Sequence, residues 1–363
     1  MKILIATGIY PPDIGGPATY SSLLYRELPK RGISVEIVTY GEAGVSMSIP
    51  KGVRHILYFY KCLKLGRKAD VIFAQDTVSA GLPALLAAKM LNKKFFVRVP
   101  GDYAWEQGVQ RFGVKESIDE FQSRQYGWQI KILRIVQRMV VGGAEVVITP
   151  SHYFKTIVSQ WLNNSDKIKV IYNGIELVSN NFVKNQNFNY QIVSVGRLVP
   201  WKGFSKLIQL MRELPNWQLT IVGDGPDREL LEAQTKELSL SDRVNFVGSV
   251  SPVELQNIYN KSSVFILNTK FESFSFALVE ALQAGLFCIA TNVGNLKEIM
   301  KESDEGVFFE PDDLASLKKI IKQVENDQEW YYKIVANGKK RAEFFSINKT
   351  LDELDQLFKK IVK

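Results

Sequence analysis

The chain has 363 residues, of which 46% are hydrophobic and 23% are charged, ordinary values for a globular protein of two or three domains with sizeable cores. No run of about 18 apolar residues occurs, so we expect no transmembrane helix, and the N-terminus lacks the long apolar region of a signal peptide. The two cysteines, Cys62 and Cys288, lie far apart and suit a reducing compartment. The sequence therefore predicts a cytoplasmic protein.

The net charge of +8 belongs to the first half of the chain. Residues 1–180 hold 23 Lys and Arg against 14 Asp and Glu, whereas residues 181–363 hold 23 against 24. The balance of +9 suits an anionic partner such as a membrane surface or a lipid phosphate, and a solvated surface without a partner explains it equally well. Peripheral attachment to a membrane is therefore a hypothesis. Nucleic-acid binding rests on charge alone, and we expect none.

Apolar runs of strand length alternate with helical patterns in the first half. Strands are expected at residues 2–7, 34–40, 53–60, 70–75, 95–99 and 146–150, and helices at 18–30, 81–91 and 107–141. Such alternation predicts a parallel sheet covered by helices on both faces. The loop after the first strand contains Gly15 and Gly16, which suit either the close approach of a phosphate or a simple turn.

Two further features of the first half are ambiguous. Asp102 follows the strand at 95–99, at the sheet edge where ligands of such folds bind, so it is a site candidate, and a helix cap is the alternative. Residues 107–141 mix aromatic and basic side chains. This mixture fits a helix at a membrane interface and also a packed helix with a solvated basic face.

The strand-loop-helix pattern restarts after an Asn-rich stretch that we interpret as a linker, residues 179–190. Strands are expected at residues 192–195, 218–222, 244–247, 263–267, 286–290 and 307–309. Arg197 and Lys202 follow the first of them. Two cations there can bind a diphosphate and stabilise it as a leaving group. The alternative is a solvent-exposed loop that binds no ligand.

The stretch FESFSFALVEALQAG at residues 271–285 carries Glu272 and Glu280 on either side of a predicted helix start. Ser273 or Ser275 is suited to cap that helix, whose N-terminus can hold a phosphate. Glu280 lies one to two turns inside and can accept hydrogen bonds from sugar or ribose hydroxyls. A phosphate flanked by hydroxyls describes a nucleotide sugar, although two glutamates at this spacing also occur by chance.

Seven motifs in this order resemble the family-4 glycosyltransferases, also called glycosyl transferases group 1, which are retaining enzymes of the GT-B fold. The motifs are PPDIGGPATY at 11–20, YNGIE at 172–176, VGRLVPWKGF at 195–204, IVGDGP at 221–226, VNFVGSVSPVELQNIY at 244–259, FESFSFALVEALQAG at 271–285 and ATNVGNLKEI at 290–299. The resemblance implies an α/β protein with two doubly wound Rossmann-like domains facing across a cleft. We expect an acceptor-side domain at 1–178, a nucleotide-sugar domain at 191–343 and a C-terminal helix at 344–363 that returns to the first domain.

The resemblance also implies roles for individual residues. Arg197 and Lys202 would bind the donor diphosphate, Glu280 the ribose, and Glu272 the transferred sugar. Further donor contacts would come from Gly15, Gly16, Val250, Ser273, Phe274, Ser275 and Phe276. Two departures stand out: many relatives have His-Gly where this chain has Pro100-Gly101-Asp102, which makes Asp102 the expected acceptor-side group, and Asn295 replaces a glycine.

The sequence thus predicts transfer of a sugar from a UDP- or GDP-linked donor to a hydroxyl, with retention and without a required metal or cofactor. The acceptor would be a glycan or a lipid-linked sugar of envelope polysaccharide or glycoconjugate synthesis. A nucleotide-sugar epimerase and a non-catalytic nucleotide-sugar-binding protein are the alternatives. A dinucleotide-dependent dehydrogenase is disfavoured, because no G-x-G-x-x-G follows the first strand.

Overall fold

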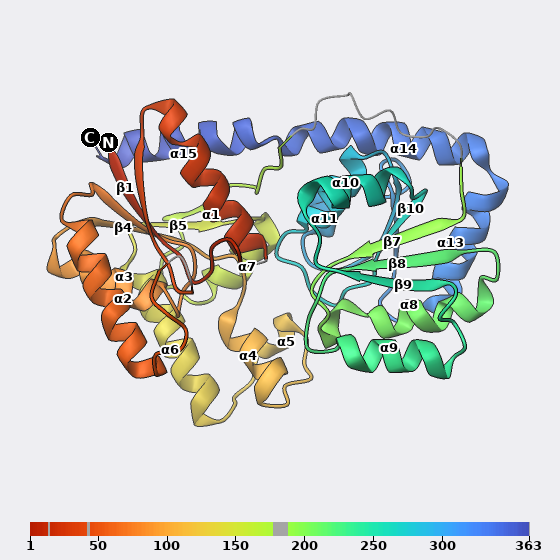
Figure 1. Cartoon of the computed structure of the whole chain (residues 1–363). Coiled ribbons are helices and arrows are strands. Elements are labelled where there is room, and N and C mark those ends of the chain that lie inside the picture. Colours follow the sequence, from red (N-terminus) through yellow and green to blue (C-terminus); the bar gives the residue numbers. More distant parts are fainter. Residues whose placement is uncertain (14, 42–43, 177–187, 363) are drawn as a thin grey trace. The chain divides into compact units, whose positions relative to one another are not determined.

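The structure is a computed structural model that describes residues 1–13, 15–41, 44–176 and 188–362. The chain divides into two compact units (Figure 1). The first unit consists of Met1–Asn173 and Asn348–Lys363, and the second is Gly174–Ile347. Most of the predicted linker at 179–190 lies outside the described residues.

The first unit is built on a six-stranded parallel sheet. Its strands are β1 (Lys2–Ala6), β2 (Ser34–Val38), β3 (Val71–Ala74), β4 (Lys94–Arg98), β5 (Val146–Thr149) and β6 (Ile168–Val170), in the order β2-β1-β3-β4-β5-β6. β3 and β5 are buried at every residue. Continuous burial is expected of parallel strands that are covered on both faces.

Helices cover both faces of this sheet. They are α1 (Gly16–Glu27), α2 (Lys51–Gly66), α3 (Gly81–Met90), α4 (Tyr103–Arg111), α5 (Ile118–Ser123), α6 (Trp128–Gly143), α7 (His152–Ser159) and α15 (Ile347–Val362). On one face, Ile72 of β3 lies against Gly66 at the end of α2. On the other, Phe358 of α15 contacts the rings of Phe73 and Phe96 at centroid distances of 5.7 and 5.6 Å. The last helix therefore returns to the first unit, as expected.

Two predictions within the first half are wrong. Residues 53–60, predicted as a strand, belong to α2, where Tyr58 and Cys62 are buried four residues apart on one helix face. Residues 107–141 are not one helix but parts of α4, α5 and α6. Gly113, with φ of 69°, lies between α4 and α5 in the left-handed region that favours glycine.

The second unit repeats the architecture. Its strands are β7 (Gln191–Val195), β8 (Gln218–Val222), β9 (Val244–Gly248), β10 (Val264–Leu267), β11 (Phe287–Thr291) and β12 (Val307–Phe309), all parallel in the order β12-β11-β10-β7-β8-β9. Its helices are α8 (Phe204–Leu210), α9 (Arg228–Glu237), α10 (Pro252–Asn260), α11 (Phe276–Gln283), α12 (Leu296–Ile299), α13 (Leu314–Asn326) and α14 (Gln328–Ala342). Two parallel sheets flanked by helices confirm the predicted α/β class with two Rossmann-like domains.

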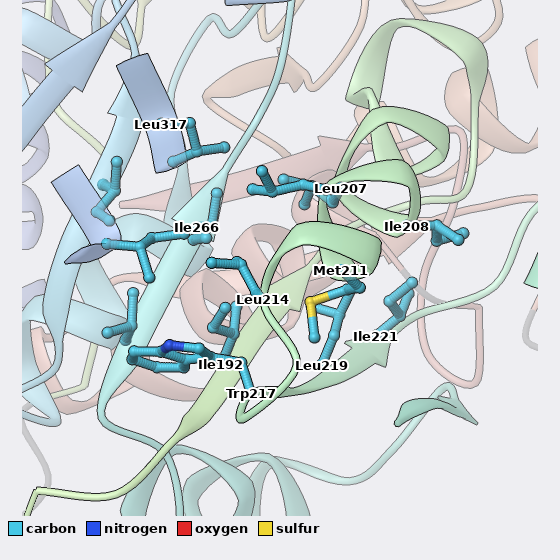
Figure 2. Packing of buried hydrophobic residues seen from close by; sticks show 14 of the residues in the cluster. Ile192, Leu207, Ile208, Met211, Leu214, Trp217, Leu219, Ile221, Ile266 and Leu317 are labelled. Atoms are coloured by element: carbon cyan, nitrogen blue, oxygen red, sulfur yellow. The ribbon is translucent and has the colours of Figure 1, made fainter. Parts of the chain in front are cut away.

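The hydrophobic core of the second unit lies between its sheet and the helices α8 and α13. Figure 2 shows Met211 beside the strand residues Leu219 and Ile221, with Leu207 above them and Trp217 near Ile192. Trp217 is completely buried. This packing fixes α8 against β7 and β8 and so holds the loop that joins β7 to α8.

Candidate active site

The second sheet changes its winding direction between β7 and β10. β7 comes first in this unit, with β8 on one side and β10 on the other. Connections leave the two central strands in opposite directions, and in such sheets ligands bind in the crevice beyond the carboxyl ends at this point. The loops that follow β7 and β10 carry Arg197, Lys202 and Glu272.

Hydrogen bonds join these two loops. The carbonyl of Trp201 accepts from the backbone N–H of Lys270 at 2.7 Å and from the Thr269 hydroxyl at 3.2 Å. Asn268 Nδ2 donates to the carbonyl of Gly203 at 2.9 Å. A Cβ at Gly203 would lie 2.4 Å from the carbonyl oxygen of Asn268, and φ there is 61°, so this contact requires glycine. The two loops therefore behave as one body.

Lys202 and Glu272 form an ion pair where the two loops meet. Their side chains are only 15% and 11% exposed. Burial raises the pKa of Glu272, and the charge of Lys202 opposes that rise. Without Lys202 the carboxylate would be buried with no compensating charge, which is costly.

Arg197 lies on the same loop as Lys202 and is exposed. The loop packs on the turn after β8: the N–H of Leu198 donates to the carbonyl of Asp224 at 3.0 Å, and a Cβ at Gly223 would meet the carbonyl oxygen of Gly196 at 2.0 Å. Within the part of the chain that the structure describes, no ion pair engages the Arg197 guanidinium. It is thus a cation available to a ligand.

α11 begins beside this pair. The Ser275 hydroxyl caps it by accepting from the backbone N–H of Leu278 at 3.2 Å, so Ser275 and not Ser273 is the cap. Phe274 is buried against Phe276 and Phe345, with ring centroids 5.6 and 5.7 Å apart. The N–H groups of a helix's first turn lack intrahelical acceptors and favour an anion.

Glu280 lies five residues after the cap on α11. Tyr259 of α10 donates its hydroxyl to Glu280 Oε2 and to the carbonyl of Ala277, each at 3.4 Å. Burial raises the pKa of Glu280 to about 7, although the hydroxyl of Tyr259 opposes this. A hydroxyl donated by a ligand would favour the ionised form further. Sequence analysis missed Tyr259, whose only signal is its place at the end of a helix with a capping box.

The loop after β11 adjoins the same region and contains an unusual buried amide. Thr291, the last residue of β11, accepts from the N–H of Thr269 at 3.0 Å and donates to its carbonyl at 2.6 Å. Asn295, four residues later, is fully buried, and neither amide atom of its side chain has a hydrogen-bond partner among the residues that the structure describes. Buried polar groups are normally paired, so Asn295 is suited to a partner that the chain itself does not supply.

The remaining predicted residues belong to other elements. Val250 is partly exposed between β9 and α10. Gly15, with φ of 146°, precedes α1 in the first unit, and Gly16 is the first residue of that helix. Asp102, also in the first unit, is fully buried and caps α4.

The carboxylate of Asp102 is fully engaged by its own unit. It accepts from the N–H of Trp105 at 3.1 Å, from Gln137 Nε2 at 3.0 Å and from Gln122 Nε2 at 2.9 Å. These contacts match the helix-cap alternative. The acceptor-side role that the resemblance implies is the competing assignment, and substitution of Asp102 decides between the two.

Two family models match the chain in succession. The first, Glycosyltransferase Family 4, covers residues 14–178, and the second, Glycosyl transferases group 1, covers residues 179–341. The second match includes both loops and α11.

Among similar proteins, an uncharacterized glycosyltransferase of Methanocaldococcus jannaschii is 28% identical over 94% of this chain and 93% of its own length. The lipopolysaccharide core biosynthesis glycosyltransferase LpsD of Rhizobium meliloti is 30% identical over 41% of this chain and 43% of its own length. The crystal structure of Anabaena HepE in complex with UDP and glucose has a TM-score of 0.78 at 18% identity, covering 99% of both chains. The predicted resemblance is confirmed: the chain belongs to the glycosyltransferases that the family-4 and group-1 models describe, and it has their GT-B fold.

Proposed function

We propose that the protein is a retaining glycosyltransferase that moves a sugar from a UDP- or GDP-linked donor to a hydroxyl of a glycan or lipid-linked acceptor. The observation that carries this proposal is the meeting of Lys202, Glu272 and the capped start of α11 at the point where the second sheet changes direction. A cation, a carboxylate and a helix N-terminus together fit a diphosphate joined to a sugar.

The donor diphosphate binds to Lys202, Arg197 and the N–H groups at the start of α11, with Ser273 and Phe276 contributing backbone contacts. Lys202 and Arg197 each carry a full positive charge, and the start of α11 carries a partial positive charge. They stabilise the negative charge that builds on the diphosphate as its bond to the sugar breaks. Such charge balance is our reason for proposing that no divalent metal is required.

The sugar and the nucleoside occupy opposite sides of this diphosphate site. Glu272 accepts hydrogen bonds from the sugar. The diphosphate competes with Glu272 for the ammonium group of Lys202. Glu280 accepts from the ribose hydroxyls, with Val250 beside the base. Because the uncompensated carboxyl of Glu280 is half-protonated near neutral pH, donor binding releases protons there.

The biological setting is also part of the proposal. The likeness to a lipopolysaccharide core enzyme supports envelope polysaccharide or glycoconjugate synthesis. Both cysteines are buried thiols, which supports the predicted cytoplasmic, reducing location.

The test is a panel of UDP- and GDP-sugars screened by thermal shift, since a ligand that binds only the folded chain raises its melting temperature. The donor that binds is then given to glycan acceptors, and NMR of the product identifies the anomer. We expect retention, an unchanged rate with EDTA, and loss of transfer in Lys202→Met. The matched control is Lys206→Met on the neighbouring α8. A donor turned over equally by both variants would refute the assignment, and an epimerised donor without transfer would favour the alternative.

A further inference from the structure

Three helices on one face of the first unit present an apolar surface to solvent. α2, α3 and α6 lie side by side over the sheet (Figure 1). Among the described residues, ten of the eighteen large hydrophobic side chains that are exposed belong to these helices. They are Val53, Ile56, Leu57 and Tyr60 on α2, Leu86 and Met90 on α3, and Trp128, Ile132, Ile135 and Met139 on α6. We call this set the apolar face.

The apolar face follows helical spacing. On α6 the exposed residues recur at intervals of four, three and four from Trp128 to Met139, which places them in one stripe. The opposite stripe, which includes Ile130 and Val140, is buried against the unit. α6 is thus apolar on two sides, and packing explains only one of them. Exposed apolar patches of this kind mark interaction sites.

The charges on these three helices all have one sign. α2, α3 and α6 together contain eight Lys and Arg and no Asp or Glu. Lys61, Lys64, Lys89, Lys131 and Arg138 among them are exposed. An anionic partner is therefore favoured over a neutral or basic one.

A hollow of about 360 Å³ beside α2 combines both properties. Val45, Ile49, Leu57 and Tyr60 line it together with Lys61 and Lys64. Apolar walls with two ammonium groups suit a molecule that has an apolar part and a negative group, as an anionic lipid has.

We propose that the apolar face docks on an anionic lipid bilayer. The aliphatic side chains and Trp128, which is 68% exposed, enter the boundary between headgroups and acyl chains, and the surrounding Lys and Arg bind lipid phosphates and carboxylates. A nucleic acid would use the cations but leave the aliphatic residues in water. None of the helices within the described residues is long and apolar enough to cross a membrane.

The proposed docking would bring the enzyme to the surface that holds a lipid-linked acceptor. It does not depend on the proposed glycosyl transfer. The vesicle experiment below contains no donor. Its failure therefore leaves the assignment of the donor site standing, and loss of donor binding leaves the vesicle result standing.

The full chain is sedimented with vesicles of phosphatidylcholine, with and without phosphatidylserine. We expect binding only to the anionic vesicles, weakened by salt. Ile132→Gln with Ile135→Gln removes two exposed apolar groups and is expected to weaken binding at least tenfold. Lys131→Gln with Arg138→Gln is expected to weaken it about fivefold per charge. The matched control is Leu230→Gln with Val253→Gln, two positions of the second unit that are even more exposed than the two isoleucines, which should bind like the unaltered chain.

Insertion has its own readout, because both native cysteines are buried. A polarity-sensitive dye on Ile135→Cys is expected to shift to the blue with anionic vesicles, and the same dye on Leu230→Cys is not. Equal binding by the α6 variants and the control overturns the proposal. So does a dimer that dissociates in Ile132→Gln with Ile135→Gln, since a second copy would then cover the face.

Discussion

Replacing Lys202 with methionine tests the central contact of the candidate site. Methionine keeps the length of the side chain and removes its charge, so Glu272 stays buried without a cation. Removing one partner of a buried ion pair costs about 3–5 kcal/mol. Because both side chains here keep a small exposure of 15% and 11%, we expect the lower end, about 3 kcal/mol of unfolding free energy. The double variant Lys202→Met with Glu272→Gln removes both charges and should cost about 1 kcal/mol.

The pH dependence of this loss has a definite sign. Burial raises the pKa of Glu272 above its ordinary value, so stability from this group is present at low pH and is lost as pH rises through the pKa of the folded state. Without Lys202 the pKa rises further and more stability is lost. The deficit of Lys202→Met is therefore largest at neutral pH and shrinks as pH falls towards the ordinary pKa of glutamate.

Hydrogen exchange of peptides from β10 and β11 measures this deficit in the second unit alone. Transfer assays measure the other consequence, a fall of about 10²–10³ in kcat. Lys206→Met is the control for both. If the single and double variants were equally destabilised, Lys202 would not be neutralising Glu272, and our account of the site would be refuted.

Three other predictions concern the same unit. Glu280→Gln should raise KM for the donor about tenfold and abolish the improvement of donor affinity that we expect as pH rises through about 7; an unchanged pH profile would contradict the ribose role. The same variant should be more stable than the parent chain above pH 7 by thermal unfolding, since the raised pKa of Glu280 costs stability there. Asn295→Ala removes a buried amide that has no partner among the described residues and leaves a small cavity, so the two effects should offset and the donor-free chain should keep its stability within about 1 kcal/mol; a much larger loss would show that the amide is paired.

The alternation of strands and helices was predictable because each buried strand is a short apolar run. Residues 70–75, for example, contain β3 (Val71–Ala74). Residues 53–60 misled the prediction because their β-branched and aromatic side chains favour strands locally. Tertiary contacts decide otherwise: Tyr58 is buried and its hydroxyl donates to the carbonyls of Thr7 and Val38, each at 3.0 Å, which ties α2 to the ends of β1 and β2.

The members of the candidate site were predictable singly, but their contacts were not. Lys202 and Glu272 are 70 residues apart, and they meet because β10 is one of the two strands that pair with β7. A sequence shows which strands exist but not which of them pair. Tyr259 was missed for the same reason, since its contact with Glu280 joins two different helices.

Substitutions of Asp102 distinguish a structural role of its carboxylate from a catalytic one. Its two carboxylate oxygens accept from Trp105, Gln122 and Gln137, and its side chain has no exposed surface, so an acceptor hydroxyl can reach it only if these bonds break. Asp102→Ala leaves three buried donors without an acceptor and should cost about 3 kcal/mol or more. Asp102→Asn keeps an oxygen for the helix cap and should cost about 1 kcal/mol. An amide cannot take a proton as a base, yet we expect Asp102→Asn to retain transfer within about tenfold. Loss of about 10³ in kcat by a folded Asp102→Asn enzyme would instead assign the carboxylate to the chemistry.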